Sequence, residues 1–503
     1  MLLSDGVEIM ASIKDVVFVQ SERHDVKYVL RICAVAALGG ILFGYDTSVI
    51  SGAIDSLRDY FQLSPAETGW AVSNVVVGCI IGAALSGWMA HRLGRRVTLF
   101  ICAILFTISA LGAALVHSFL WFVIYRMIGG VAVGVASAVS PMYMSEVSPK
   151  DMRGRALTME QFAIVLGQVV VFIVNYLIAR SASTEWLRDV GWRWMIASEI
   201  VPCAIFCATI FLIPESPRWH VLRGRDEEAL TTLKRISNEQ HAHSLLGEIR
   251  ESVSSMELDA RNSVSVLKRD GAKWIIFVGA MIALLQQLTG VNVIMYYAPM
   301  VLKSTSGGIQ AALFQTIWIG VVSVAGAILG AWIIDRKGRL PLIRVGSVAM
   351  CIGLLIVSWA LYTQTTGLLA LTGMLLFMFA YGMSWGPVTW TLVAEVFPNA
   401  IRSIGMSIAV SCQWIMNFGV SQTFPMLSDN KFLNDHFHGA FSMWLFAGLC
   451  LVCMWFVLKF VPETKGVSLE KIEAVMLSRR PGGAPSQVSP VNTPVVPAVS
   501  GQE

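Results

Sequence analysis

Three ionisable residues interrupt long apolar stretches of this sequence. Asp46 stands in GYDTS, Arg126 in YRMIGG and Glu199 in ASEIVP. An ionisable group inside a membrane-spanning helix is unfavourable and marks an ion or substrate pathway by default. Beside a guanidinium a buried carboxylate stays ionised, whereas apart from it the acid takes a proton, because an unpaired buried charge is costly. A helix movement that separates Asp46 from Arg126 would therefore couple proton binding to conformation; the alternative is a purely structural ion pair.

A second set of residues offers neutral polar chemistry within the apolar stretches. Amides both donate and accept hydrogen bonds, and indoles stack on flat C–H faces while donating one N–H, which suits a sugar. The alternative is that each amide joins two helices, a contact worth about 0.6–2 kcal/mol. The candidates are Gln161, Gln168, Gln286, Gln287, Asn292, Trp390, Gln413 and Trp414.

Spacing refines this set. Gln161 and Gln168 are seven residues apart and share a helix face. Gln287 and Asn292 flank Gly290, where we expect the helix to loosen. Gly386 and the proline that follows it in WGPVTW predict a second interruption.

The elements that must position these residues are transmembrane helices. Hydrophobic residues make up 55% of the 503 and charged residues only 14%, against about 25% in soluble proteins. A helix needs about 20 mostly apolar residues to cross the hydrocarbon core. Such runs occur at 29–53, 68–90, 97–117, 120–144, 157–179, 193–213, 274–301, 312–334, 341–363, 367–392, 403–427 and 437–461. The sequence thus predicts an all-α integral membrane protein, since the runs are too long and too continuously apolar for barrel strands.

Basic residues give the orientation. HRLGRR follows the second run and DRKGR the eighth, and a charged, helical-looking stretch separates the sixth run from the seventh. The positive-inside rule places these links and both termini in the cytoplasm. The predicted organisation is an N-terminal segment (1–28), a six-helix bundle (29–213), a cytoplasmic helical linker (214–273), a second six-helix bundle (274–461) and a largely disordered tail (462–503).

The two halves repeat one another. WMAHRLGR at 88–95 matches WIIDRKGR at 332–339, EVSPKDMR at 146–153 matches EVFPNAIR at 395–402, and PESPR at 214–218 matches PETKG at 462–466. A repeat of six helices keeps the same orientation in both halves. We therefore expect two pseudo-symmetric bundles with a solute site between them, opened alternately to each side.

The repeated motifs also predict a conformational latch at the cytoplasmic ends of the helices. Glu146 with Arg153, and Glu395 with Arg402, can bridge to the basic turns, and we expect Glu199 to couple to this network. The alternative is a set of topology signals and surface ion pairs worth about 0–1 kcal/mol each. The predicted gate comprises Arg92, Arg95, Glu146, Arg153, Glu215, Arg218, Asp335, Arg336, Arg339, Glu395, Arg402 and Glu463.

These strings identify a family. GYDTSVISG, RMIGG, PMYMSEVSPKDMRG, PESPRW, QQLTGVN, WGPVTW, AEVFPNAIR and VPETKG resemble the sugar porter branch of the major facilitator superfamily, in order over nearly all of 30–470. Within that branch the chain is most similar to bacterial D-xylose–proton symporters, on QFAIVLGQ, NYLIARS with GWRWM, and CQW. One position departs from the family: its first DRxGRR motif usually starts with Asp, and this chain has His91, which predicts a weaker or pH-sensitive latch in the N-terminal half.

The resemblance implies roles for individual residues. Asp46 is expected to pair with Arg126 and to take the proton. Gln161, Gln286, Gln287, Asn292, Trp390 and Gln413 match residues that hold the sugar, and Phe43, Tyr296, Gly386 and Trp414 match its wall and gate. The implied partners are a sugar, a proton and membrane lipid, and the implied setting is the bacterial inner membrane, with the protein a monomer.

Other functions fit less well. An uncoupled sugar facilitator would lack the acid at position 46, and a sugar sensor would carry long signalling extensions. No nucleophile–base constellation or phosphate loop supports a membrane enzyme, and the nine cysteines all lie in apolar runs, so we expect no metal and no cofactor. The net charge of +4 sits in short clusters between apolar runs, which argues against nucleic-acid binding.

Overall fold

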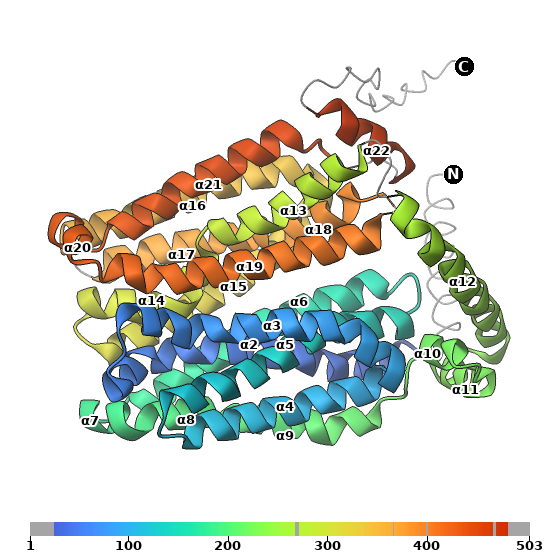
Figure 1. The fold of residues 1–503 in the computed structure, drawn as a ribbon, viewed down its shortest axis with the longest axis horizontal. Helices are drawn as coiled ribbons and strands as arrows, with labels where there is room; N and C mark the ends of the chain where they lie inside the picture. The colour runs from blue at the N-terminus through green and yellow to red at the C-terminus, as the bar shows by residue number, and fades with distance from the viewer. Residues whose placement is uncertain (1–24, 267–270, 366, 399–400, 466–468, 481–503) are drawn as a thin grey trace, which may run out of the picture.

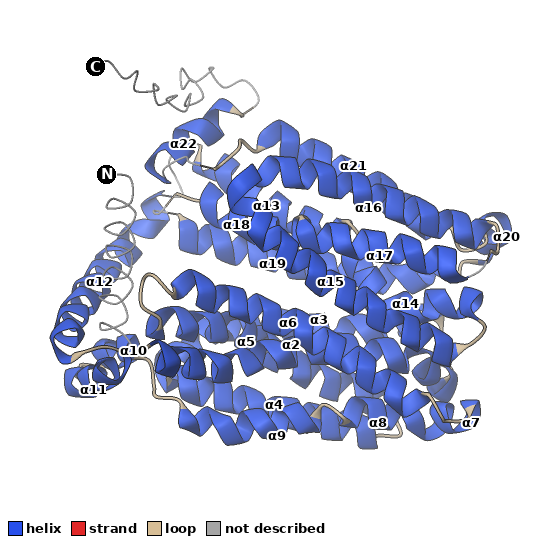
Figure 2. Ribbon diagram, turned by 180° about the vertical axis from the view of Figure 1, so that it is seen from behind, coloured by secondary structure: helices blue, strands red, loops and turns tan. Residues whose placement is uncertain are grey.

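The computed structural model describes residues 25–266, 271–365, 367–398, 401–465 and 469–480 of the chain. These residues form helices and turns, and no strand occurs among them (Figure 2). Twelve helical segments of the described chain are long and apolar enough to cross a membrane. The all-α class and the twelve spans predicted from the sequence are therefore confirmed. The predicted disordered end of the tail, from about residue 480, lies outside the described residues.

The first six spans occupy the N-terminal half. The sixth, Thr184–Leu212, begins earlier than the predicted run and is built from short pieces: α7, a π-helical turn, α8, α9 and a 3₁₀ turn. The others are single helices. The bounds are α2 (Val26–Phe61), α3 (Pro65–Leu93), α4 (Arg95–Leu115), α5 (Phe119–Val147), α6 (Arg153–Ala179), α7 (Thr184–Trp186), α8 (Trp192–Ala197) and α9 (Ile200–Thr209).

The second half repeats the pattern with two interrupted spans. The bounds are α13 (Ala272–Leu288), α14 (Val291–Ser306), α15 (Ile309–Lys337), α16 (Arg339–Tyr362), α17 (Gly367–Met383), α18 (Trp385–Val396), α19 (Arg402–Ser428), α20 (Lys431–Phe437) and α21 (Phe441–Phe460). Gly290, at φ +85°, separates α13 from α14, and a Cβ there would lie 2.8 Å from Phe446 Cγ. The predicted loosening at Gly290 is thus confirmed.

The interruption of the tenth span falls slightly earlier than the sequence predicts. Ser384 lies between α17 and α18, and Gly386 and Pro387 belong to the first turn of α18. Proline is tolerated there because the first N–H groups of a helix have no partner within it.

Each half folds as a bundle, and the two bundles lie side by side as the two layers of Figure 1. In the first, α3 and α5 approach so closely that a Cβ on Gly130 would lie 2.0 Å from Val75 O. In the second, α15 and α17 meet in the same way, and a Cβ on Gly326 would lie 2.5 Å from Phe379 O. Small residues let membrane helices approach at van der Waals distance, where packing rather than the hydrophobic effect holds them together.

Three linker helices cap one end of the molecule (Figure 1): α10 (Pro217–Leu222), α11 (Asp226–Ile236) and α12 (Glu239–Val266). Asp25 N donates to Ile236 O at 2.9 Å, so α2 begins against α11. The short α22 (Leu469–Ser478), inside the segment expected to be largely irregular, lies at the same end. We call this the linker end, and the opposite end, with α7 and α20, the far end.

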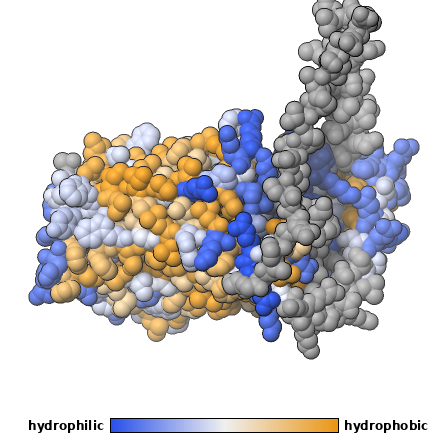
Figure 3. Space-filling model, turned by 90° about the horizontal axis from the view of Figure 1, so that it is seen from above, coloured by the Kyte–Doolittle hydropathy of each residue, from blue (hydrophilic) through white to orange (hydrophobic). Residues whose placement is uncertain are grey.

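The outer surface carries the apolar side chains that lipid requires. Figure 3 shows a broad hydrophobic band over the bundles, with hydrophilic residues gathered toward the two ends. Leu212 is 73% exposed and Leu368 70%, which in water would favour aggregation. The chain is therefore a multi-pass membrane protein.

Candidate functional site

The ionisable residues predicted from the sequence meet inside the N-terminal bundle. Asp46 on α2 and Arg126 on α5 are fully buried, and Arg126 Nη1 lies 2.7 Å from Asp46 Oδ1. Arg126 Nη2 also donates to the Asp46 carbonyl at 3.1 Å. Gly129, one turn along α5, leaves room for the pair, since a Cβ there would lie 3.2 Å from Asp46 Oδ1.

Glu199 brings a second carboxyl to the same pair. It lies in the turn between α8 and α9, is 1% exposed, and interacts electrostatically with both Asp46 and Arg126. Within the described residues, no other group donates a hydrogen bond to Asp46 Oδ2 or to either Glu199 carboxyl oxygen, and the two carboxyls interact with each other. Two buried carboxyls thus face one guanidinium, and since an uncompensated buried charge costs several kcal/mol, one proton on the carboxyl pair makes the group neutral.

The amides predicted from the sequence gather mainly in the C-terminal bundle. Gln413 Nε2 on α19 donates to Gln286 Oε1 on α13 at 3.1 Å, and Gln286 Nε2 donates to Trp385 O at 3.2 Å. Asn292 Nδ2 donates to Gln287 Oε1 at 2.6 Å across the interruption at Gly290. The broken span therefore places an amide on each side of the break in hydrogen-bonding reach of one another.

The remaining predicted site residues come from both bundles. Phe43 on α2 and Trp414 on α19 form an aromatic contact between the bundles, with ring centroids 6.0 Å apart. Gln161 on α6 is exposed and Gln168, two turns further on, is half-buried. The other three are Tyr296 on α14, buried, and Gly386 and Trp390 on α18, both half-buried.

Three polar residues near these sites were missed in the sequence. Tyr381 on α17 interacts with the Gln286 side chain, and Asn417 on α19 interacts with Tyr296. Glu160 on α6 is 3% exposed. All three lie within predicted spans. A search that covered every polar residue of each run would have found Tyr381 and Asn417, whereas Glu160 stands at the start of its run.

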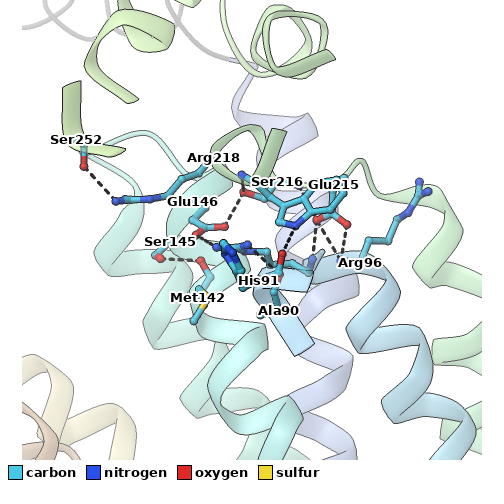
Figure 4. A network of polar contacts seen from close by, with 12 residues as sticks. Ala90, His91, Arg96, Met142, Ser145, Glu146, Glu215, Ser216, Arg218 and Ser252 are labelled. Carbon is cyan, nitrogen blue, oxygen red and sulfur yellow. Dashed lines mark hydrogen bonds and ion pairs between the residues drawn. The ribbon is translucent and has the colours of Figure 1, made fainter. Parts of the chain in front are cut away.

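The predicted gate forms a network at the linker end of the first bundle (Figure 4). Arg95 Nη2 lies 2.8 Å from Glu146 Oε1, and Ser216 Oγ donates to Glu146 Oε2 at 2.6 Å. Glu215 accepts from the backbone N–H groups of Arg95 and Arg96 at the start of α4. These contacts join α4, α5 and the start of the linker.

The second bundle has the same network in the same order. Arg339 makes two hydrogen bonds to Glu395, at 2.6 and 3.1 Å, and Thr464 Oγ1 donates to Glu395 Oε2 at 2.5 Å. Glu463 accepts from the backbone N–H groups of Arg339 and Leu340 at the start of α16. The sequence repeat is therefore a structural repeat.

Other predicted gate arginines contact backbone or aromatic groups. Arg153 Nε donates to Ser145 O at 3.0 Å and Arg402 Nε to Phe397 O at 3.3 Å, so Glu146 and Glu395 reach the basic turns through Arg95 and Arg339. Arg92 lies over Trp88, Arg336 over Trp332, and Arg218 Nη2 donates to Ser252 Oγ.

The Asp335 side chain lies outside the described residues. His91 contributes its backbone carbonyl, which accepts from Trp219 Nε1 at 2.9 Å, and its side chain is exposed.

At the far end the two bundles are tied to each other. Arg58 pairs with Asp429 at 2.7 Å, and Lys303 pairs with Asp55 at 3.0 Å. Gln422 on α19 accepts from Ser73 at 2.7 Å and donates to the Ala66 carbonyl at 2.9 Å. These contacts close the far end between the bundles.

The described residues contain no group of three His, Cys, Asp or Glu side chains that could hold a metal ion. What the arrangement offers is an acid–guanidinium cluster in one bundle and an amide–indole cluster in the other. The first can exchange a proton, and the second can hold a neutral hydroxylated ligand.

Known proteins resemble this chain in sequence and in fold. Residues 32–476 match the model of a family described as "Sugar (and other) transporter". The D-xylose-proton symporter of Escherichia coli is 42% identical over 90% of this chain and 96% of its own length. The glucose facilitated diffusion protein of Zymomonas mobilis is 34% identical over 90% of this chain and 98% of its own. The inward open conformation of the E. coli xylose transporter XylE matches with a TM-score of 0.79 and 39% identity, over 89% of this chain and all of that one.

Proposed function

The chain belongs to the family of sugar transporters, and from that premise we propose that it is a proton-coupled sugar symporter. Its sugar is D-xylose or a closely related pentose or hexose such as glucose, imported by alternating access. The observation that carries the proposal is the buried cluster of two carboxyls and one guanidinium at Asp46, Glu199 and Arg126. Such a cluster is neutral only with one proton, so its proton content is tied to its geometry.

The coupling follows from that charge balance. With Arg126 against Asp46, the shared proton resides on the Glu199 side of the cluster. When α5 moves relative to α2 and takes Arg126 away, Asp46 is left unpaired in a dry site and binds a proton in its turn. A change of conformation therefore loads or unloads a proton, and sugar binding that favours one conformation drives proton movement.

The sugar site lies between the bundles. Gln286, Gln287, Asn292 and Gln413 present amides from the second bundle, with Trp390 as a stacking surface, and Gln161 and Gln168 present amides from α6. The amide–amide hydrogen bonds give this site a polar surface that sugar hydroxyls can replace without leaving a buried group unpaired. Phe43, Trp414, Tyr296 and Gly386 form its apolar wall.

The arrangement described here is the inward-facing one. The far end is closed by ion pairs between the bundles, and the chain matches an inward open relative over nearly its whole length. Within each bundle the linker-end network stays intact. We infer that segments 29–213 and 274–461 rock as units and that the linker-end networks meet each other in the outward-facing form.

We further infer that the linker end is cytoplasmic, with both termini on that side, because the basic turns before α4 and α16 lie there. The setting is the bacterial inner membrane, where a proton gradient is available. One chain supplies both clusters and both networks, so a monomer surrounded by lipid is sufficient for transport.

An uncoupled facilitator is the second candidate, favoured by the Zymomonas relative named above. A sugar sensor is the third. The buried acid separates the first candidate from both, because neither passive permeation nor sensing needs a group that exchanges protons.

Gradient-driven uptake tests the proposal. Purified protein in liposomes, with an imposed proton gradient and a panel of radiolabelled sugars, should accumulate one sugar above the outside concentration. One charge crossing 100 mV releases about 2.3 kcal/mol and one pH unit about 1.4 kcal/mol, which together support accumulation of a few hundred-fold. Uptake that reaches the same steady state with and without the gradient would show a facilitator, and sugar binding without uptake would show a sensor.

A further inference from the structure

Another buried carboxyl lies outside the cluster and the linker-end networks described above. Glu160 on α6 is 3% exposed, and its side chain packs against the backbone of α2. A Cβ on Gly40 would lie 2.9 Å from Glu160 Oε1, so only glycine leaves room for the carboxyl there. Gly40 precedes Asp46 by six residues, about 9 Å along α2 toward the linker end.

The hydrogen bonds around Glu160 can all be made at once when it carries a proton. Ser140 Oγ on α5 lies 2.8 Å from the Ala36 carbonyl and 3.0 Å from Glu160 Oε2, with Met144 Sδ more distant at 3.9 Å. A serine hydroxyl has one proton, and a carbonyl oxygen can only accept. If Ser140 donates to Ala36, the second contact is a hydrogen bond only when Glu160 donates, and that requires the carboxylic acid.

The surroundings of Glu160 also favour a neutral group. On α2 its titratable neighbour is the Cys33 thiol, which lies 3.4 Å from Ser148 Oγ. On α5 it faces Ser140 and Met144, neither of which ionises. Within the described residues no cation is recorded in contact with it, and a carboxylate would therefore be buried without a counter-ion.

Glu160 also has a direct route to the sugar site. It immediately precedes Gln161, which is exposed and which we have placed against the sugar. The acid ties α6 to α5 through Ser140 and packs α6 on α2 at Gly40. Its contacts therefore fix the rotation of α6 at the turn that presents Gln161.

We propose that Glu160 is a second proton-binding site, separate from the Asp46–Glu199 pair, and that the proton it holds positions Gln161 for sugar binding. The proposal rests on the proposed function, because it assumes that Gln161 contacts sugar. It makes Glu160 a positioning residue that acts through its neighbour. Since the protonated form holds α6 in place, sugar affinity is full at low pH and falls as rising pH removes the proton.

Infrared spectroscopy tests whether the proton is present. Protein in lipid should show, beside the carbonyl stretching band of the protonated Asp46–Glu199 pair, a second such band that disappears in Glu160→Gln and shifts in Ser140→Ala, because the latter loses the acceptor. Glu185→Gln, at an exposed far-end glutamate, is the matched control and should leave the band unchanged. A spectrum of Glu160→Gln that retains both wild-type bands overturns the assignment.

Sugar binding then tests the role of the proton. In the Asp46→Asn background Glu199 is the one carboxyl left to balance Arg126 and stays ionised, so the dissociation constant should rise by up to about tenfold per pH unit on the alkaline side because of Glu160 alone. Adding Glu160→Gln, which cannot ionise and keeps a donor toward Ser140, should abolish that rise. A double variant with the same pH dependence as Asp46→Asn alone overturns the proposal.

The symporter proposal and the Glu160 proposal are contradicted by different results. Wild-type protein that never accumulates sugar under a proton gradient contradicts the symporter. Wild-type protein that accumulates sugar, with binding of unchanged pH dependence in Glu160→Gln, contradicts only the second proton site.

Discussion

The two bundles share one fold but differ in the polar residues that they bury. The N-terminal bundle holds the ionisable groups Asp46, Arg126, Glu199 and Glu160, whereas the C-terminal bundle holds the hydrogen-bonded amides Gln286, Gln287, Asn292 and Gln413. The linker-end networks, by contrast, are alike in the two bundles. The repeat thus preserves the parts that both halves need for rocking, and the differences place the proton in one half and most of the sugar site in the other.

Removing the acid of the N-terminal bundle should abolish proton coupling. Asp46→Asn keeps the size of the side chain but cannot exchange a proton, so accumulation of a few hundred-fold should fall to none. Counterflow, in which labelled sugar exchanges against unlabelled sugar without a gradient, should remain measurable. Energised vesicles of this variant that still accumulate sugar would remove Asp46 from the coupling.

Removing an amide of the C-terminal bundle should weaken sugar binding instead. Gln287→Ala loses hydrogen bonds to sugar and leaves Asn292 without its partner, which should weaken binding by about 1–3 kcal/mol, or roughly 5- to 150-fold. Trp390→Ala should weaken binding by removing the stacking surface. Calorimetry measures both, with Gln240→Ala on the linker as the exposed control; unchanged affinity in the site variants would exclude these residues from the site.

Equivalent substitutions in the two linker-end networks should slow transport to a similar extent, because the two networks make the same contacts. Glu146→Gln and Glu395→Gln each remove the charge that faces a buried or partly buried arginine, Arg95 or Arg339, and each should slow transport by a similar factor, of order tenfold. Initial rates at saturating sugar provide the comparison. A large loss in only one variant would show that the repeated networks have diverged in role.

The far-end pair should have the smallest effect. Arg58 and Asp429 are partly exposed, so their ion pair contributes about 0.2–1 kcal/mol to the inward-facing form. Arg58→Gln should shift the equilibrium toward the outward-facing form by at most a few-fold, seen as faster labelling of a cysteine placed at the far end. Adding Asp429→Asn should cause little further change, and additive effects would show that the pair does not act as a unit.

The helices and the buried acid could be predicted from the sequence. Twelve continuous apolar runs predict twelve helices because lipid permits little else, and a charge such as Asp46 is conspicuous within them. The partner of Glu146 was less predictable: Arg95 stands in the basic turn HRLGRR and Arg153 in EVSPKDMR, and only the helix geometry decides which arginine reaches the carboxylate. The Gln286–Gln413 contact joins residues 127 positions apart, which no local pattern specifies.

Glu160 shows a different reason for failure. It stands near the start of the predicted run 157–179, where a charge at the membrane interface is ordinary and the long side chain can reach water. Only the packing of α6 against Gly40 and Ser140 shows that it points into the bundle instead. Side-chain direction at the end of a span depends on tertiary contacts, and the sequence does not carry that information locally.

The division of proton and sugar between the bundles is tested most directly by counting protons per sugar. Proteoliposomes with an internal pH indicator and labelled sugar give both fluxes at saturating sugar. The account predicts the same proton-to-sugar ratio for wild-type protein and Gln287→Ala, and sugar flux without proton flux for Asp46→Asn. A lowered ratio in Gln287→Ala, or an unchanged ratio in Asp46→Asn, would contradict it.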